Sequence, residues 1–459
     1  MKPLMIGISG LRGVIGGGLT PEVVARAAAA FGTLLGGGTV VMGRDSRVSG
    51  DFVRSAALSG LMSTGCTVTD VGICPTPTVQ IWAEAFDGGV VLTASHNPQE
   101  WNGLKFIGGD GLFLDAGRTA DLVRCYEEQM AAYVGWDRLG QVAFEPDPFL
   151  KHMERVEQLD LLDMDLLQQR RFKVVFDGCN ASMSELGPGF LERMGCEVIA
   201  LHCQPTGIFP RSPEPVPANL GDLCKAVVAN GAEAGFAVDP DGDRLSLVSG
   251  DGVALGEEYT LALATQYVLS RRSGTVVINL STSRMIEDIA TAAGAAVERT
   301  PVGEINVAAR LRDIKGVIGG EGNGGVILPQ AHYGRDALVG MALILQAMAE
   351  GGASLSGLAE ALPAYHMIKR TYALGAMEPG QMTAALAEHY AGASPDCSDG
   401  VRLSWPDRWV HVRRSNTEPI IRVVAEAPTR TGAEDLVRGT IEAMESLIQR
   451  RQGKPGKGR

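Results

Sequence analysis

Three stretches of the chain repeat one pattern of hydrophobic and polar positions. Each begins with a run of β-branched residues, continues through a small polar loop into a helical pattern, and ends in a small-residue turn and a second apolar run. These stretches are residues 40–72, 173–201 and 275–303. Each predicts a β-α-β unit, which needs a right-handed crossover and a sheet covered on its faces. We therefore expect three related α/β domains.

The last part of the chain, from about Ala364 onward, has a different pattern. Alternating apolar and polar positions predict strands at 372–379, 400–407, 408–415 and 418–427, and a closing helix is expected at 432–450. Together the patterns predict three α/β domains and a smaller α+β domain at the C-terminus. The expected domains are residues 1–147, 148–250, 251–363 and 364–459.

The amino-acid composition indicates which cellular location and which classes of binding partner to expect. The 459 residues include 53 acidic and 41 basic side chains, so the formal net charge is −12. Nucleic acids and anionic membranes need a basic face, and neither is expected as a partner. Pro and Gly break the N-terminus MKPLMIGISGLRG before a signal-peptide core could form, and no apolar run approaches the length of a membrane span. Eight dispersed cysteines without a C-x-x-C pair argue against zinc and disulfide frameworks, so a cytoplasmic location is expected.

A polar segment follows an apolar run at residues 91–106, which read VLTASHNPQEWNGLKF. Ser95 could cap a helix, because Ser, Asn and Pro favour turns and helix starts. It could also carry function, because loops at the carboxyl ends of strands in α/β domains commonly bind ligands. The segment alone favours the first interpretation, and matching chemistry in other loops would favour the second.

A second loop is acidic. In GFAVDPDGDRLSLV, from Gly235, three aspartates alternate directly after an apolar strand: Asp239, Asp241 and Asp243. Carboxylates so close repel one another unless a cation lies among them. An EF-hand would need Gly at its sixth position and Glu at its twelfth, where this chain has Arg244 and Gly250. The pattern favours a compact Mg²⁺ site over a solvated acidic turn, and Arg244 could pair with a carboxylate or a phosphate.

Six motifs in order give the chain a family resemblance: GISGLRG, TASHNP, NGLKF, DPDGDR, GEGNGG and RRSNTEPIIR. The chain resembles members of the α-D-phosphohexomutase superfamily, which includes phosphoglucomutases, phosphomannomutases and phosphoglucosamine mutases. The resemblance implies mixed sheets in the α/β domains and a central cleft between the four domains. It also implies a phosphoserine at Ser95 and Mg²⁺ held by Asp239, Asp241, Asp243 and an oxygen of the Ser95 phosphate.

The same resemblance implies a reaction. Phospho-Ser95 would give its phosphoryl group to a hexose monophosphate, the resulting hexose 1,6-bisphosphate would turn around, and its other phosphoryl group would return to Ser95. The dephosphorylated enzyme would need a hexose 1,6-bisphosphate as primer. Lys105 would handle a proton near the attacking hydroxyl or act only as an electrostatic clamp. Arg12 would steady the phosphoserine and His96 would hydrogen-bond around it, although either could be a surface or packing residue.

Two further loops would hold the substrate. In RRSNTEPIIR, a distal-phosphate dock would consist of Arg413, rather than Arg414, with Ser415, Asn416, Thr417 and Arg422, unless this is only a polar turn. In GGEGNGGVILP, the glycines have G-x-G-x-x-G spacing, but VILP predicts a strand where a dinucleotide fingerprint needs a helix. The resemblance implies that this loop reads the sugar through Glu321 and Asn323, with Thr300 and Gly303 also contacting it.

The sugar loop departs from the commoner family pattern, because Gly325 stands where that pattern has His, as in an archaeal-type subgroup. His332, in AHYGRDA, could enter the site instead or be structural. The expected substrates are small-molecule sugar phosphates, with phosphomannomutase/phosphoglucomutase activity as the first expectation and phosphoglucosamine mutase as the alternative. A sugar phosphatase and a catalytically silent sugar-phosphate binder are less favoured candidate functions. No pattern indicates the oligomeric state.

Overall fold

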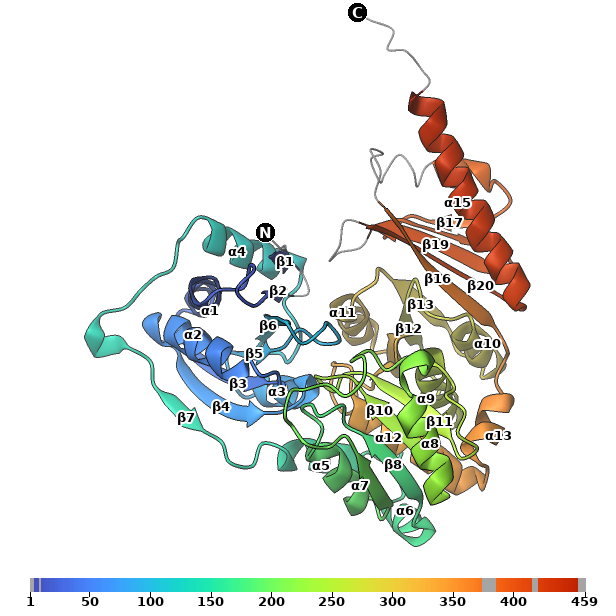
Figure 1. Ribbon diagram of the computed structural model, residues 1–459, viewed down its shortest axis with the longest axis horizontal. Coiled ribbons are helices and arrows are strands. Elements are labelled where there is room, and N and C mark those ends of the chain that lie inside the picture. Colours follow the sequence, from blue (N-terminus) through green and yellow to red (C-terminus); the bar gives the residue numbers. More distant parts are fainter. Residues whose placement is uncertain (1–3, 8–9, 374–384, 415–419, 453–459) are drawn as a thin grey trace, which may run out of the picture.

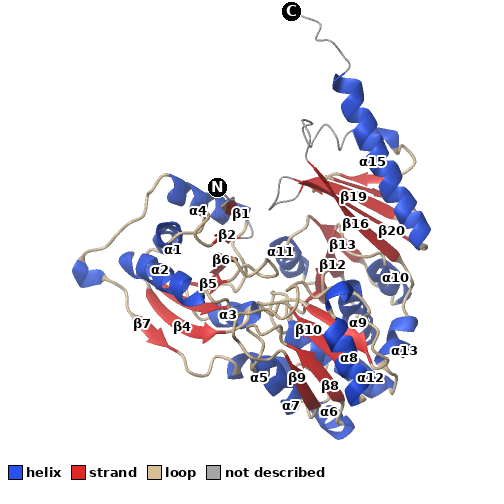
Figure 2. Ribbon diagram, in the orientation of Figure 1, coloured by secondary structure: helices blue, strands red, loops and turns tan. Residues whose placement is uncertain are grey.

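The computed structural model describes residues 4–7, 10–373, 385–414 and 420–452. Figures 1 and 2 show four sheets that follow one another in chain order, with helices against their faces. Three sheets mix parallel and antiparallel strands, and the C-terminal sheet is antiparallel throughout. The predicted fold class, three related α/β domains with mixed sheets and a smaller C-terminal domain, is confirmed.

The first sheet has seven strands in the order β1-β2-β6-β5-β3-β4-β7. Its strands are β1 (Met5–Gly7), β2 (Gly10–Val14), β3 (Thr39–Arg44), β4 (Thr67–Ile73), β5 (Gly88–Leu92), β6 (Trp101–Gly108) and β7 (Val142–Phe144). Its helices are α1 (Pro21–Leu34), α2 (Gly50–Ser63), α3 (Thr76–Ala83) and α4 (Ala116–Glu127), followed by the short 3₁₀ helix η1 (Trp136–Arg138).

The second and third sheets have four strands each, in the orders β11-β10-β8-β9 and β13-β12-β14-β15. The second contains β8 (Lys173–Asp177), β9 (Glu197–Leu201), β10 (Ala234–Val238) and β11 (Leu245–Ser249), with α5 (Leu150–Glu157), α6 (Met164–Arg170), α7 (Leu186–Arg193), η2 (Pro217–Asn219) and α8 (Gly221–Asn230). The third contains β12 (Val276–Asn279), β13 (Val297–Thr300), β14 (Ile318–Glu321) and β15 (Gly325–Ile327), with α9 (Glu257–Arg271), α10 (Met285–Ala292), α11 (Glu304–Ile314), α12 (Ala337–Gly351) and α13 (Leu355–Glu360).

The three sheets share one plan. The first strand of each unit (β3, β8 or β12) is central, the second lies parallel on one side, and the third lies parallel on the other. A fourth strand (β6, β11 or β15) then returns antiparallel to the third. The three predicted β-α-β units thus form equivalent parts of their sheets. Each sheet also has an equivalent loop between the third and fourth strands of this plan, namely β5 and β6, β10 and β11, or β14 and β15.

The C-terminal sheet has the order β16-β20-β19-β18-β17. Its elements are β16 (His366–Ala373), β17 (Ser394–Asp396), β18 (Val401–Ser404), β19 (Trp409–Arg414), β20 (Ile420–Ala427) and α15 (Arg430–Gln452). The strand expected at 372–379 begins six residues earlier, because residues 366–373 pair along their whole length with β20. The rest of that expected strand lies outside the described residues, and β17 is an additional edge strand.

Apolar packing joins the second and third sheets into one body. A single cluster of buried side chains runs from Val156 to Leu362, and it includes most of helix α12 and the buried face of α9. The first sheet and the C-terminal sheet each have a separate core. None of the described helices combines the length and apolar character that a bilayer crossing requires. All eight cysteines lie in the described part of the chain and are free.

Candidate active site

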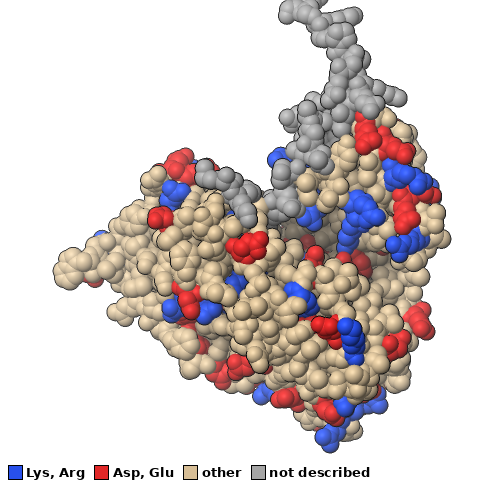
Figure 3. Space-filling model, in the orientation of Figure 1, with Lys and Arg blue, Asp and Glu red and all other residues tan. Residues whose placement is uncertain are grey.

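The three equivalent loops converge on one cleft. Residues 93–100, 239–244 and 322–324 connect the third and fourth strands of their sheets. Figure 3 shows the molecule hollowed between the first domain and the C-terminal part, with charged side chains at the hollow. The cleft has a volume of about 660 Å³, in the range of small-molecule sites. All four domains line the cleft. The first contributes Arg12, His96 and Lys105, and the second contributes Glu214 and Arg244. The third contributes Gly303, Glu304, Glu321, Asn323 and Arg335, and the C-terminal domain contributes Lys369, Arg413 and Arg422.

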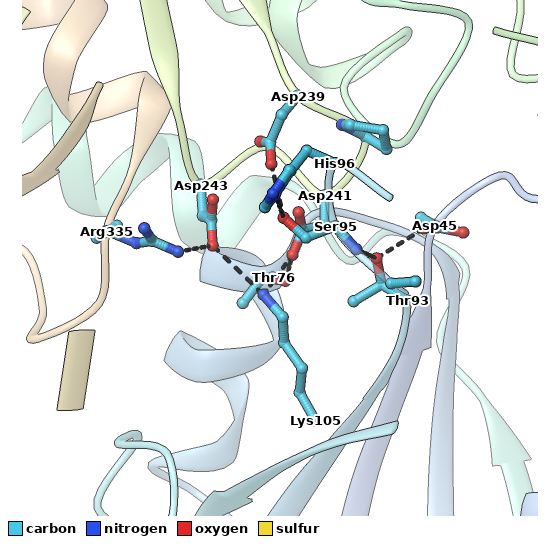
Figure 4. A network of polar contacts seen from close by, with 12 residues as sticks. Asp45, Thr76, Thr93, Ser95, His96, Lys105, Asp239, Asp241, Asp243 and Arg335 are labelled. Atoms are coloured by element: carbon cyan, nitrogen blue, oxygen red, sulfur yellow. Dashed lines mark hydrogen bonds and ion pairs between the residues drawn. The ribbon is translucent and has the colours of Figure 1, made fainter. Parts of the chain in front are cut away.

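Ser95 lies buried in the first of these loops. No helix begins in residues 93–100, so Ser95 does not cap one. Its backbone has a φ of 49°, a left-handed conformation that is costly for a residue other than glycine. Its amide donates to the Thr93 hydroxyl at 2.9 Å, and its own hydroxyl donates to Asp239 Oδ2 at 2.9 Å. The strained loop therefore aims the Ser95 hydroxyl at the acidic loop (Figure 4).

A buried ion pair in the GRDSR segment holds this conformation. Arg47 Nε contacts Asp45 Oδ2 at 3.0 Å, and both side chains are fully buried. The two terminal nitrogens of Arg47 donate to the carbonyl groups of Ser95, Asn97, Pro98 and Trp101 at 2.6–3.0 Å. Asp45 also accepts from Thr93, so the pair reaches both sides of Ser95. Arg47 thus connects a scaffold strand to nearly the whole Ser95 loop.

The acidic loop places three carboxylates together without solvent. Asp239, Asp241 and Asp243 are fully buried, and one oxygen from each lies within 4.8 Å of the others. Gly242 has a φ of 68°, and a Cβ there would lie 2.6 Å from Met183, so the turn requires glycine. Thr76 at the start of α3 donates to Asp241 Oδ2 at 2.7 Å, which ties the loop to the first domain.

Burial and mutual repulsion determine the protonation of these groups. Burial, together with the charges of Asp243 and Asp241, raises the pKa of Asp239 well above its usual range. Burial alone would raise the pKa of Asp241, but Lys105 outweighs it and lowers that pKa. Lys105 Nζ lies 2.5 Å from Asp241 and 3.3 Å from Asp243. Burial would lower the pKa of Lys105, but the two carboxylates raise it, so Lys105 is a cationic hydrogen-bond donor.

The donor set fits a divalent cation. Asp241 Oδ1 and Asp243 Oδ1 are buried and accept no hydrogen bond from any described residue. Buried acceptors are rarely left without a partner, and hard cations such as Mg²⁺ prefer carboxylate oxygens. The cluster is therefore consistent with a metal site.

A second cluster, His152, His332 and Asp336, does not have this character. The Gly334 amide donates to His332 Nδ1 at 3.0 Å, so the ring proton lies on Nε2, which donates to Asp336 at 3.1 Å. His152 also contacts Asp336 at 2.8 Å, and its other ring nitrogen contacts Thr78. His332 is absent from the residues that line the cleft. These contacts occupy both ring nitrogens of each histidine and give His332 a structural place.

The sugar loop holds its carboxylate firmly. Glu321 Oε1 accepts from Asn279 at 2.8 Å and from the Gly303 amide at 3.0 Å. Glu321 Oε2 accepts from Arg335 at 2.7 Å and from Asn323 at 3.3 Å. A carboxylate offers about four acceptor positions, and protein donors occupy all four here. Thr300 is buried behind this loop and donates to the Pro301 carbonyl group.

Five charged residues at the cleft were not predicted as site residues from the sequence: Glu214, Glu257, Glu304, Arg335 and Lys369. Arg335 contacts Asp243, Glu321 and Glu304, and Glu304 opens α11 beneath it. The segment AHYGRDA contained a signal, because Arg335 and Asp336 directly precede an apolar helix. The sequence analysis instead considered His332 of this segment as a site residue, but its ring contacts Asp336 and does not line the cleft.

Basic side chains flank the Ser95 loop. Arg12 donates to Asn97 Oδ1 at 3.1 Å, and the Arg244 amide donates to Asp239 Oδ1 at 3.2 Å. Arg12 Nε and Arg244 Nε are buried and donate no hydrogen bond to any described residue. His96 Nδ1 lies 3.3 Å from the Ser95 hydroxyl. The charge of Arg244, followed by burial and the charge of Arg12, lowers the pKa of His96 well below its usual range, so His96 is neutral near pH 7.

The expected phosphate dock is described in part. Arg413 on β19 pairs directly with Arg422 on β20, so two like charges occupy adjacent positions on one face of the sheet. Arg413 is also 3.8 Å from Asp399, and burial lowers the pKa of Arg413. Ser415, Asn416 and Thr417 lie outside the described residues. The paired arginines at the cleft suit an anion such as a phosphate.

Comparison with known proteins agrees with this arrangement. Models of the phosphoglucomutase/phosphomannomutase family match residues 3–132 (alpha/beta/alpha domain I), 147–252 (domain II), 256–365 (domain III) and 376–443 (C-terminal domain). A probable phosphoglucosamine mutase of Methanopyrus kandleri is 38% identical over 451 residues, 96% of this chain and 98% of the relative. Six further relatives, 32–34% identical, bear the same name.

Two other relatives broaden the comparison. A phosphoglucomutase/phosphomannomutase of Thermococcus kodakarensis is 36% identical, over 97% of this chain and 99% of the relative. A crystal structure of a phosphoglucomutase/phosphomannomutase family protein from Burkholderia thailandensis superposes with a TM-score of 0.83 at 28% identity, over 96% of this chain and 98% of that one.

The contacts of Arg47 with the Ser95 loop lead to a first prediction. Arg47→Lys keeps the charge beside Asp45 but cannot donate to four carbonyl groups, so the Ser95 loop should relax. We expect kcat for mutase turnover to fall by about 10²-fold, because misplacing reacting groups by about 1 Å has that effect. Arg44→Lys is the control, since the Asp51 partner of Arg44 is 83% exposed and such pairs contribute little. Equal kcat values for the two variants would contradict this role of Arg47.

Proposed function

This chain is a phosphohexomutase of the phosphoglucomutase/phosphomannomutase family, and we propose that it interconverts glucosamine 6-phosphate and glucosamine 1-phosphate. The first expectation from the sequence was phosphomannomutase/phosphoglucomutase activity, and the relatives favour the phosphoglucosamine mutase alternative. An amino sugar brings a positive charge, and Glu214 and Glu257 line the cleft, where they pair with Arg244 and Lys369.

The mechanism rests on buried atoms around Ser95 that form no hydrogen bond with any described residue. They are the acceptors Asp241 Oδ1 and Asp243 Oδ1 and the donors Arg12 Nε and Arg244 Nε, and Arg244 Nε lies at ion-pair distance, 3.8 Å, from Asp243 Oδ1. Acceptors without a hydrogen bond suit a cation and donors without one suit an anion. A phosphoryl group on Ser95 and a divalent cation at the aspartates would satisfy both sets. Ser95 is thus the phosphoryl carrier in this proposal.

The charges also balance. Five carboxylates (Asp239, Asp241, Asp243, Glu304 and Glu321) surround four cations (Arg12, Lys105, Arg244 and Arg335) in the buried region. A phosphoserine brings about two negative charges, so a divalent cation entering with it leaves the total nearly unchanged. Asp239, Asp241 and Asp243 would hold Mg²⁺ with an oxygen of phospho-Ser95. When bound, Mg²⁺ supplies positive charge that stabilises a phosphoryl group in transfer.

The remaining residues orient the sugar and move protons. Phospho-Ser95 gives its phosphoryl group to the free hydroxyl of the hexose monophosphate, and the hexose 1,6-bisphosphate turns around before returning the other one. Arg413 and Arg422 bind the phosphate that is not reacting in either orientation. Lys105, held cationic by Asp241 and Asp243, acts as an electrostatic clamp and hydrogen-bond donor, and the proton that leaves the attacking hydroxyl is returned to the Ser95 oxygen as its phosphoryl group departs. A sugar hydroxyl reaches Glu321 by replacing its longest bond, the one from Asn323.

Removing the hydroxyl of Ser95 tests the carrier role. Ser95→Ala should retain less than about 10⁻³ of the wild-type kcat, because no covalent phosphoryl intermediate can form. Intact-protein mass spectrometry should find a phosphoryl group on the wild type after incubation with glucose 1,6-bisphosphate, and none on the variant. Ser59→Ala, on the exposed face of α2, is the control and should behave as the wild type. Substantial turnover by Ser95→Ala would refute the carrier role.

An isosteric change at the acidic loop tests the metal site. Asp241→Asn removes the charge that faces both Lys105 and the cation, so Mg²⁺ affinity measured by calorimetry should fall by at least about tenfold. Turnover should fall by about 10³-fold. Asp51→Asn, which changes an exposed carboxylate on α2, should affect neither quantity. An Asp241→Asn enzyme with wild-type Mg²⁺ dependence would exclude Asp241 from the metal site.

The substrate is tested by competition. The protein is incubated with Mg²⁺, a trace of glucose 1,6-bisphosphate and equal amounts of glucosamine, mannose and glucose 6-phosphates, and ³¹P NMR follows the products. We expect the anomeric phosphate signal of glucosamine 1-phosphate to grow fastest. Faster growth of the mannose or glucose signal would assign phosphomannomutase or phosphoglucomutase activity instead. Growth of inorganic phosphate alone would indicate a phosphatase.

A further inference from the structure

Arg335 forms ion pairs with a carboxylate of the acidic loop and with the carboxylate of the sugar loop. One terminal nitrogen lies 2.5 Å from Asp243 Oδ2, and the other lies 2.7 Å from Glu321 Oε2. Its Nε lies 3.0 Å from Glu304 Oε2, and its amide also contacts Glu304 at 3.2 Å. The side chain is 8% exposed and lies at the cleft wall. Figure 4 shows it approaching Asp243 from the side opposite Ser95.

The stem of Arg335 occupies the space in front of Gly325. A Cβ at Gly325 would lie 2.2 Å from Arg335 Cδ and 2.9 Å from Cγ, well inside van der Waals contact. The stem cannot easily move aside, because three carboxylates hold the guanidinium at its end. Gly325 is therefore a condition for the observed position of Arg335. Any side chain at position 325 would compete with it.

We propose that Arg335 is a positioning residue that fixes the sugar loop relative to the acidic loop. Asp243 belongs to the proposed cation site and Glu321 to the proposed sugar contact, so their separation sets the distance between the reacting phosphoryl group and the sugar hydroxyls. A guanidinium presents several donors in a rigid plane, and this geometry can hold two carboxylates at a defined spacing. An ammonium group is a single point charge and can satisfy one of them well.

This inference rests on the proposed function only through phosphohexomutase turnover, not through the identity of the sugar. The assays use whichever sugar phosphate the wild type isomerises fastest. A wild type that isomerises none of the three sugars would refute the proposed function. The inference itself is judged from variants compared with an active wild type.

Arg335→Lys is the first test, because it keeps the positive charge among Asp243, Glu304 and Glu321 and so preserves folding. Losing the planar guanidinium, with its several donors, should raise KM for the sugar phosphate and lower kcat, each by about tenfold. Arg155→Lys is the control, since Arg155 pairs with Glu84 across another domain contact outside the cleft. A merely structural role would lower the melting temperature without a change in KM. Wild-type KM and kcat in Arg335→Lys would overturn the inference.

A double-mutant cycle with Gly325 gives an independent test. Gly325→Ala should displace Arg335 and produce the same rise in KM and fall in kcat, each by about tenfold. In an Arg335→Ala background the added methyl group meets no stem, so Gly325→Ala should change KM and kcat by less than about twofold. This non-additivity would support the inference. Equal effects of Gly325→Ala in both backgrounds would overturn it, because Gly325 would then act without Arg335.

Discussion

The site is organised around one electrostatic constraint, the burial of three aspartates on a single tight loop. At separations below 4.8 Å, each pair of charged carboxylates repels by about 3–4 kcal/mol even at a protein-like effective dielectric constant. Several neighbouring groups reduce this repulsion. Asp239 has a raised pKa and accepts the Ser95 hydroxyl, Lys105 neutralises Asp241, and Arg335 faces Asp243. Two oxygens have no donor among the described residues, which is why a divalent cation fits.

The fold provides this chemistry by using one hairpin three times. Equivalent loops between the third and fourth strands supply the serine, the aspartates and the sugar-loop carboxylate. The second and third domains share a core and Arg335 joins their loops, whereas the Ser95 loop reaches them from a separate core. The C-terminal domain is docked on the third domain by polar contacts, such as Glu426 with the Arg284 amide and His411 with Ser281. The arginines of the proposed phosphate dock are therefore carried by a third, separately packed body.

Much of this could be predicted from the sequence because it is encoded locally. Strand and helix periodicity revealed the three β-α-β units, and short motifs located Ser95 and the aspartates in their loops. Contacts between distant segments could not be predicted in the same way. Arg335 reaches Asp243 across 92 positions, so no spacing rule identifies its role. The two interpretations of His332 could not be separated, because a lone histidine gives the same signal whether it faces a cleft or a structural aspartate. The start of β16 was misplaced because its limits follow from pairing with β20.

The central claim is that the aspartate loop is a cation site completed by Ser95, and anomalous diffraction from crystals soaked in Mn²⁺ tests it most directly. Mn²⁺ accepts the same oxygen ligands as Mg²⁺ and scatters anomalously. We expect one strong peak bound by Asp239, Asp241 and Asp243 beside the Ser95 side chain, and no peak at His152, His332 and Asp336. A peak at the histidine cluster with none at the aspartates would contradict the claim.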